Sequence, residues 1–280
     1  MGAIGGWWGR RTRWQQFLVL VVLAGLVYLA YTRLRGPSGV DTSVFIVSSS
    51  GGGDEQLVSD GRDPAWSPDG DFLAITLDGD NGDEINTVDI TGSDPSPVAD
   101  GSEAAWSPDG ASLAFAAEDS DGITGIYMLA VDGGEPSFVS EGNHPAWSPD
   151  GTTLAFDVAD ADGVIGVNLI ELETSTLTFV TEGEEPTWAP GGDGLAFVLE
   201  NANGDDEIYT VDLTGGEPVH VTDGDDPTWS TGGVIAFTGE GSDGAAVFTI
   251  EPGADPVEIA DGEAPTWSPD GGQIAFTREG

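Results

Sequence analysis

Short apolar runs, separated by polar or glycine-rich turns, recur along the chain from residue 43 onward. One run, Leu-Ala-Phe or a close variant, occurs six times and predicts six copies of a fully buried strand, because a strand covered on both faces is apolar without alternation. The six copies are Leu73-Ala74-Ile75, Leu113-Ala114-Phe115, Leu154-Ala155-Phe156, Leu195-Ala196-Phe197, Ile235-Ala236-Phe237 and Ile274-Ala275-Phe276.

A tryptophan precedes each apolar run by seven residues, or by six in the fifth copy. The tryptophans are Trp66, Trp106, Trp147, Trp188, Trp229 and Trp267, with spacings of 40, 41, 41, 41 and 38 residues. Ser-Pro-Asp-Gly follows four of them and is typical of a tight turn, since Pro presets φ, Asp bonds back to the backbone and Gly accepts positive φ. The fourth and fifth copies lack Ser-Pro-Asp, which leaves the geometry of those two turns open.

Two further apolar runs follow in each unit, so that about 41 residues hold four short strands. Ile126-Tyr127-Met128-Leu129 and Ser137-Phe138-Val139 are examples. Repeated four-stranded units of this length are typical of propeller blades. The fold class predicted is all-β, a six-bladed β-propeller over residues 43–280.

The two ends of the repeat region predict how the ring closes. Only two strands' worth of sequence follows Trp267, while two strands without a unit, residues 43–47 and 56–58, precede Trp66. We therefore expect the last blade to combine the N-terminal and C-terminal strands, which removes exposed sheet edges.

The motif Ala-Trp-Ser-Pro-Asp-Gly followed by Leu-Ala-Phe resembles the TolB-like, WD-like β-propeller repeat, strongly in four units and loosely in two. The resemblance implies a six-bladed propeller that binds partners at one mouth of its channel. It implies little about activity, because similar repeats occur in periplasmic assembly proteins, in propeller domains of oligopeptidase-like enzymes and in some lyases.

The first 42 residues differ from the rest in charge and hydropathy. Residues 1–13 are expected to be a short cytoplasmic N-terminus, residues 14–32 a transmembrane signal anchor and residues 33–42 a linker. The uncharged run from Phe17 to Tyr31 is flanked by arginines on both sides, and the first acidic residue is Asp41. Three arginines before the run and two after it favour an inside N-terminus, which places the propeller outside the cytoplasm at the cell membrane. A cleaved secretory signal is the alternative interpretation.

The propeller region is extremely acidic. The chain has 50 Asp and Glu against seven arginines and no lysine, and residues 36–280 carry a net charge of −48. Such a surface repels phosphate backbones and argues against a nucleic-acid partner. It is also the composition of a halophilic protein, because molar salt screens the self-repulsion. With no cysteine, disulfide and thiolate chemistry is excluded.

A candidate site lies in the loops that join one blade to the next, where each repeat has an acid, a glycine and two variable residues. Six such loops are expected to surround one mouth of the channel. The candidate partner-binding residues there are Arg62, Asp63, Glu103, Asn143, His144, Glu184, Glu185, Asp225, Asp226 and Glu263. Crowded carboxylates attract cations, so a cationic protein or peptide is the expected partner, and Ca²⁺ is a possible cofactor. The Ca²⁺ candidates, and the expected main contact, are Glu184, Glu185, Asp225 and Asp226.

The function expected is a non-catalytic binding scaffold of the cell envelope. The alternative is an envelope carbohydrate- or peptide-processing enzyme that uses channel carboxylates, with or without Ca²⁺. The position of His144 discriminates between them: a closed pocket against two carboxylates favours the enzyme, and an open rim favours the scaffold. His220, in the run Val219-His220-Val221, is interpreted as an ordinary sheet residue.

Overall fold

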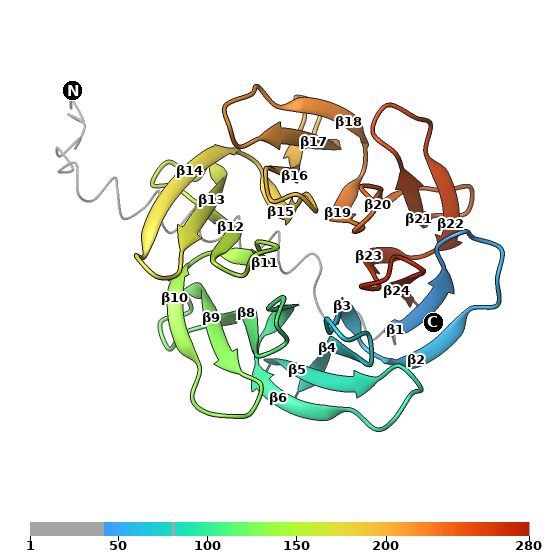
Figure 1. The fold of residues 1–280 in the computed structure, drawn as a ribbon, viewed down its shortest axis with the longest axis horizontal. Coiled ribbons are helices and arrows are strands. Elements are labelled where there is room, and N and C mark those ends of the chain that lie inside the picture. The colour runs from blue at the N-terminus through green and yellow to red at the C-terminus, as the bar shows by residue number, and fades with distance from the viewer. Residues whose placement is uncertain (1–41, 80–81, 280) are drawn as a thin grey trace, which may run out of the picture. The chain divides into compact units, whose positions relative to one another are not determined.

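The computed structural model describes residues 42–79 and 82–279, which form six four-stranded antiparallel sheets arranged as a ring (Figure 1). This confirms the all-β, six-bladed propeller. The expected cytoplasmic segment, membrane helix and nearly all of the linker lie outside the described residues. In residues 42–79 and 82–279, no helix has the length and hydropathy needed to cross a membrane.

The first three blades are continuous in sequence, and each runs from an inner strand near the axis to an outer strand. Blade 1 comprises β3 (Arg62–Trp66), β4 (Phe72–Gly79), β5 (Gly82–Asp89) and β6 (Ser96–Asp100). Blade 2 comprises β7 (Ser102–Trp106), β8 (Ser112–Glu118), β9 (Thr124–Ala130) and β10 (Ser137–Glu141). Blade 3 comprises β11 (Asn143–Trp147), β12 (Thr153–Ala159), β13 (Ile165–Glu171) and β14 (Thr176–Glu182).

The other three blades include the one that closes the ring. Blade 4 comprises β15 (Glu184–Trp188), β16 (Gly194–Glu200), β17 (Asp206–Asp212) and β18 (Val219–Asp223). Blade 5 comprises β19 (Asp225–Trp229), β20 (Ile235–Glu240), β21 (Ala245–Ile250) and β22 (Val257–Asp261). Blade 6 is a composite of β23 (Glu263–Trp267) and β24 (Gln273–Glu279) with the N-terminal β1 (Thr42–Ser48) and β2 (Gln56–Asp60), in the order β2-β1-β24-β23.

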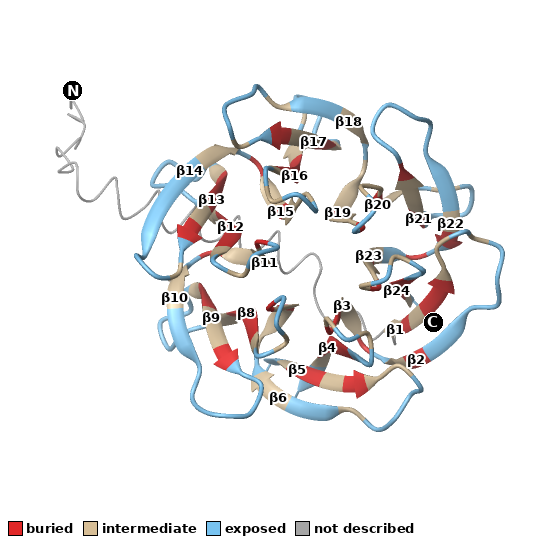
Figure 2. Ribbon diagram, in the orientation of Figure 1, coloured by how far each residue is buried: buried red, intermediate tan, exposed pale blue. Residues whose placement is uncertain are grey.

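The core lies between neighbouring blades and is built from the repeated apolar run. Phe115, Phe156, Phe197, Phe237 and Phe276 are each at most 2% exposed. Burying one such ring stabilises the fold by about 1.5–3 kcal/mol. The second strand of each blade is buried while the outer strands are largely exposed, as Figure 2 shows.

The turn after each tryptophan has the chemistry that its sequence indicates. In blade 3, Ser148 Oγ donates to Asp150 Oδ1 at 2.7 Å and accepts from the backbone N–H of Thr153 at 3.0 Å. The departures in blades 4 and 5 do not open the turn, because Gly192 N–H and Gly233 N–H still donate to Ala189 and Ser230 carbonyls at 2.9 and 3.1 Å. The same hydrogen bond from the turn glycine therefore closes the turn after the inner strand in all six blades.

Candidate functional site

The loops between blades share a backbone shape that only glycine can initiate. In the link from blade 2 to blade 3, Gly142 has φ 141°, and a Cβ there would stand 2.6 Å from the carbonyl oxygen of Asp157 and from the Phe156 ring. The equivalent glycines 61, 101, 183, 224 and 262 also have φ between 128° and 143°. This explains why the glycine of the acid-Gly pair recurs in every repeat.

The second residue after each of these glycines adopts a left-handed conformation, with φ between 48° and 55°. The six residues are Asp63, Glu103, His144, Glu185, Asp226 and Ala264. Each lies in a bulge, since the pairing of the inner strand with the second strand shifts register there, for example between Asn143 and Ala146. Bulges turn a side chain away from the regular face of its sheet, and here they present six variable side chains from equivalent places around the ring.

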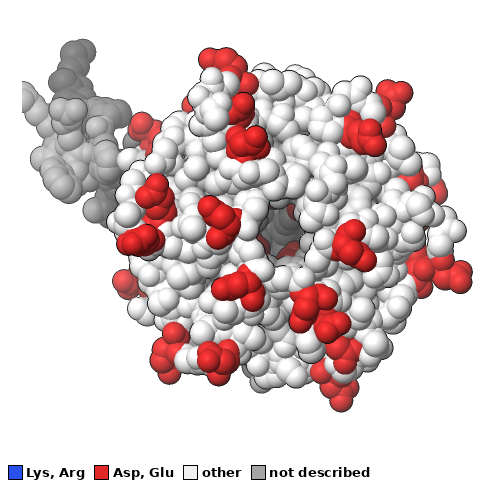
Figure 3. Space-filling view, in the orientation of Figure 1, with Lys and Arg blue, Asp and Glu red and all other residues white. Residues whose placement is uncertain are grey.

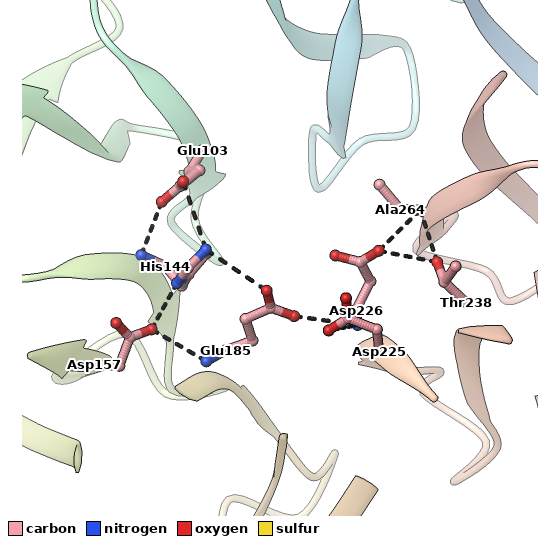
Figure 4. Close-up of polar contacts among 8 residues, drawn as sticks. All are labelled: Glu103, His144, Asp157, Glu185, Asp225, Asp226, Thr238 and Ala264. Carbon is pink, nitrogen blue, oxygen red and sulfur yellow. Dashed lines mark hydrogen bonds and ion pairs between the residues drawn. The ribbon is translucent and has the colours of Figure 1, made fainter. Parts of the chain in front are cut away.

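Five of the predicted residues come together in one continuous row across blades 2 to 5 (Figure 4). They are Glu103, His144, Glu185, Asp225 and Asp226. Two further residues belong with this row. Asp157 contacts His144, and the pKa of the Glu184 carboxyl is raised in part by the charges of Asp157 and Asp225. We call these seven residues together the acidic arc.

His144 lies among three carboxylates. Its Nδ1 is 2.6 Å from Asp157 Oδ2, and its Nε2 is 3.5 Å from Glu103 Oε1 and 3.8 Å from Glu185 Oε1. Burial alone would lower the pKa of His144, but the three carboxylates outweigh it and raise the pKa well above 6.5. The imidazole is therefore a cation at neutral pH, and it neutralises only part of the arc.

Backbone N–H groups hold the carboxylates of the arc from one blade to the next. The N–H of His144 donates to Glu103 Oε2 at 3.0 Å, and that of Glu185 donates to Asp157 Oδ2 at 3.1 Å. The N–H of Asp226 donates to Glu185 Oε2 at 3.1 Å. Each of these bonds joins two neighbouring blades, so the carboxylates are fixed in place before any ligand arrives.

The row ends at blade 6. Thr238 Oγ1 donates to Asp226 Oδ2 at 2.9 Å, and the N–H of Ala264 contacts both of these oxygens, at 3.0 Å for Thr238 and 3.3 Å for Asp226. Because Ala264 has no polar side chain, the carboxylate row does not continue into blade 6 at this position.

Burial makes part of the arc unusually basic. It raises the pKa of Glu184 to about 7, with the charges of Asp157 and Asp225 adding to the effect. Burial and the charge of Asp226 also raise the pKa of Glu185 well above 4.5. A further cation beside these carboxyl groups would favour their ionised form.

Arg62 and Asp63 contact one another in blade 1. Arg62 Nε lies 3.5 Å from Asp63 Oδ2, and its Nη1 is 2.9 Å from Asp78 Oδ1. Its Nη2 is 2.5 Å from Asp83 Oδ1. This arginine is therefore surrounded by acids of its own blade and does not reach the acidic arc.

Asn143 and Glu263 begin the inner strands β11 and β23. The backbone of Asn143 pairs with that of Asp157, and the backbone of Glu263 pairs with that of Thr277. Asn143 is half-buried, whereas the side chain of Glu263 is exposed.

The position of His144 agrees only in part with either interpretation, the scaffold or the enzyme. Its ring contacts more than two carboxylates, as the enzyme interpretation requires, yet 32% of its side chain is exposed, which is not a closed pocket. Asp157 and Thr238 also contact residues of the arc, and the sequence did not single them out. The sequence did hold a signal for Asp157, because this acid directly follows the buried apolar run Leu154-Ala155-Phe156, and an acid in a buried strand needs a partner. In the structure Asp157 is only 2% exposed.

The acidic arc offers ligands for a cation. Glu185, Asp225 and Asp226 each place one carboxylate oxygen within 4.8 Å of the others. Figure 3 shows acids around the opening of the central channel and at the outer edge of the same face, and no Lys or Arg of the described residues is seen there. The geometry suits a cationic side chain or a hard divalent cation, both of which bind carboxylate oxygens.

Solved structures share this architecture. A putative TolB from Agrobacterium tumefaciens is 22% identical with a TM-score of 0.74, covering 86% of this chain and 99% of that one. TolB from Acinetobacter baumannii is 15% identical with a TM-score of 0.62, covering 88% and 67%. Pyrococcus horikoshii acylaminoacyl peptidase is 17% identical with a TM-score of 0.50, and the similarity covers 75% of this chain but 40% of the peptidase.

No curated protein matches the sequence. The TolB beta propeller domain family, by contrast, matches residues 56–232, which is more than half of the chain. With the six blades, the composite closing sheet and the repeated turn all in place, this chain belongs to the TolB beta propeller domain family.

Proposed function

We propose that this protein is a non-catalytic, extracytoplasmic scaffold of the cell envelope, and that its acidic arc binds a cationic segment of a protein or peptide partner. The observation that carries the proposal is the row of carboxylates across blades 2 to 5, held by backbone N–H groups of the neighbouring blade. A preorganised anionic surface raises the association rate and the specificity for a cationic partner.

The charge balance of the arc supports a cationic ligand. The arc contains six carboxyl groups against a single imidazolium, so it stays anionic even with His144 protonated. A Lys or Arg side chain that approaches Glu184 and Glu185 would lower their raised pKa values by favouring the ionised form. Partner binding should therefore release protons from the protein near neutral pH.

Calorimetry with an arginine-rich peptide tests the proposal, and a parallel titration with Ca²⁺ tests the divalent cation as the alternative occupant. The test variant removes four charges but keeps an amide oxygen that can still accept the backbone bonds: Glu184→Gln, Glu185→Gln, Asp225→Asn and Asp226→Asn. The control variant removes four exposed charges in turns at the opposite ends of the strands: Asp94→Asn, Asp132→Asn, Glu135→Gln and Glu173→Gln.

We expect wild type and the control variant to bind the peptide alike and the test variant to lose at least tenfold in affinity, which corresponds to about 1.4 kcal/mol. The proton release should appear as a dependence of the binding enthalpy on the ionisation enthalpy of the buffer. Equal binding by the test and control variants, or no binding by wild type, would show that the arc is only solvated surface.

One observation favours the alternative, an enzyme that processes envelope carbohydrate or peptide. A carboxyl with a pKa of about 7, as burial gives Glu184, is suited to general acid–base catalysis. If this is the function, wild type will turn over members of an oligosaccharide or peptide panel and Glu184→Gln will not. Turnover that survives the substitution would remove Glu184 from that role.

We also propose that residues 14–32 attach the propeller to the cell membrane, on the basis of their apolar composition and flanking arginines. Membrane fractionation of the native host, followed by protease treatment of intact cells, tests this. Recovery of the full-length chain in the soluble fraction would contradict it.

A further inference from the structure

A second cluster of polar side chains lies on the outer edge of blade 4, away from the acidic arc. Glu207 on β17 and His220 and Asp223 on β18 each place a potential ligand atom within 4.8 Å of the others. The backbone pairing puts them on one face of the sheet, because Glu207 pairs with Asp223, and Tyr209, two residues further on, pairs with His220. His220 Nε2 lies 3.6 Å from Asp223 Oδ1.

The other blades show that this cluster is not a general feature of the repeat. In blade 2 the positions of Glu207 and His220 are occupied by Gly125 and Phe138, and a Cβ on the glycine would stand 2.8 Å from the phenylalanine ring. Blade 3 has the same pair, Gly166 and Phe179, with a corresponding distance of 2.6 Å. In these blades the aromatic ring packs directly on the glycine.

Blade 4 replaces both members of this apolar pair at once, with a carboxylate for the glycine and an imidazole for the phenylalanine. The third member, Asp223, is the acid that begins the link to the next blade, and an acid occupies this position in all six repeats. Of the six blades, blade 4 is therefore the one in which a histidine joins two carboxylates at these positions.

Surrounding side chains hold two of the three candidate ligands in orientation. Asn201 Nδ2 donates to Glu207 Oε1 at 2.9 Å and Tyr209 Oη donates to Glu207 Oε2 at 2.8 Å. The Tyr209 ring also packs edge-on against the imidazole, with centroids 5.3 Å apart and planes at 75°.

We propose that Glu207, His220 and Asp223 form a binding site for a divalent transition metal ion of the Zn²⁺ class. One imidazole nitrogen and two carboxylate oxygens are ligands that Zn²⁺ accepts, and three protein ligands leave one tetrahedral position for water. Bonds of about 2.0–2.2 Å place tetrahedral ligands about 3.3–3.6 Å apart, so the cluster must contract slightly. Asp223, whose side chain is 87% exposed, is free to make that movement.

The two histidines of the chain make a residue-specific test possible. In the full-length chain labelled with ¹⁵N, long-range ¹H–¹⁵N spectra report each imidazole separately, and we expect added Zn²⁺ to shift the nitrogens of His220 saturably at one equivalent. The signals of His144 should stay in place. Movement of His144 instead of His220, or of neither imidazole at millimolar Zn²⁺, would overturn the proposal.

Substitutions test the ligand set independently. Competition with a chromophoric chelator should show at least about tenfold weaker Zn²⁺ binding for His220→Phe, which installs the residue of blades 2 and 3, and for Glu207→Gln. Glu258→Gln is the control, because Glu258 pairs with Phe248 in blade 5 as His220 pairs with Tyr209 in blade 4. Wild-type affinity in a cooperatively melting His220→Phe variant would refute the site, and so would an equal loss in Glu258→Gln.

Discussion

At the scale of single residues, the repeats share a backbone conformation at the link position, while the residue type at that position varies from blade to blade. The left-handed position that carries His144 in blade 3 carries Glu185 in blade 4 and Ala264 in blade 6, with φ within a few degrees in all three. At this position the blades therefore differ in the side chain that they carry and not in the backbone conformation. The half-buried carboxyl of Glu184, next to the left-handed position of blade 4, has a pKa of about 7, well above that of an exposed acid.

Stability should fall as pH rises from about 4.5 to about 7, because burial raises the pKa of Glu184 from 4.5 to about 7. Between these values the folded state keeps a proton that the unfolded chain loses, so stability decreases with pH across this window. His144 acts in the same direction, since its contribution is complete below pH 6.5 and is lost as pH rises through its raised folded value. Glu184→Gln should flatten the decline by on the order of 1 kcal/mol, allowing for solvent screening.

Denaturant unfolding at several pH values from 4.5 to 8 measures this effect. Glu182→Gln is the matched control, because Glu182 is an exposed acid two residues away in the same link. The same pH slope in wild type and in Glu184→Gln would contradict the assigned ionisation.

At the scale of the element, the link between blades is the unit on which the site depends. The glycine of each link lets the chain pass close to the second strand, and the bulge that follows presents the side chain that the blade contributes. A change at this glycine should therefore disturb both the stability and the arc.

Gly142→Ala should be strongly destabilising, since the new Cβ would clash at 2.6 Å with both the Asp157 carbonyl oxygen and the Phe156 ring. Gly163→Ala is the matched comparison, because Gly163 also has positive φ, at 84°, but has open space around it. We expect Gly163→Ala to cost about 1 kcal/mol through its backbone conformation, and Gly142→Ala to cost at least about 2 kcal/mol more. Chemical denaturation measures both, and equal losses would mean that the close approach does not matter.

At the scale of the whole molecule, stability depends on closing the ring and on tolerating the charge. The N-terminal strand β1 pairs with the C-terminal strand β24 over seven residues. Arg278 reinforces this closure by contacting Glu55 on the N-terminal side at 2.7 and 2.8 Å and by lying 4.8 Å from the centre of the Phe45 ring.

Deleting residues 41–60 should abolish the cooperative fold. The deletion removes two of the four strands of blade 6 and exposes the edge of β24 together with the apolar surface that Val44 and Ile46 cover. Near-UV circular dichroism and a thermal melt measure the loss. A native-like spectrum with a cooperative melt would show that five and a half blades are sufficient.

The acidic surface should make the melting temperature rise from low to molar salt. Residues 36–280 carry a net charge of −48, and the screening length shortens from about 10 Å at 0.1 M to about 3 Å at 1 M. The variant lacking four exposed acids in the strand-joining turns should show a smaller rise than wild type. A melting temperature that does not change with salt would argue against adaptation to high salt.

The repeated turn and the apolar runs by themselves determined the six blades, their four strands and the pairing of N-terminal with C-terminal strands. These features follow from local sequence: Ser-Pro-Asp-Gly sets each hairpin, and Leu-Ala-Phe marks each buried strand. The sequence also indicated that Glu103, His144 and Glu185 occupy equivalent places, because equivalent repeat positions adopt equivalent backbones.

Only the tertiary structure decided which of these side chains meet. Asp157 reaches His144 because the bulge turns the imidazole toward β12, and the N–H of Glu185 reaches Asp157 because blades 3 and 4 pack together. Glu207 and His220 meet because β17 and β18 pair in one particular register. Contacts of this kind depend on twist, bulges and packing between blades, whose energies are summed over the whole ring and leave no local pattern in the sequence.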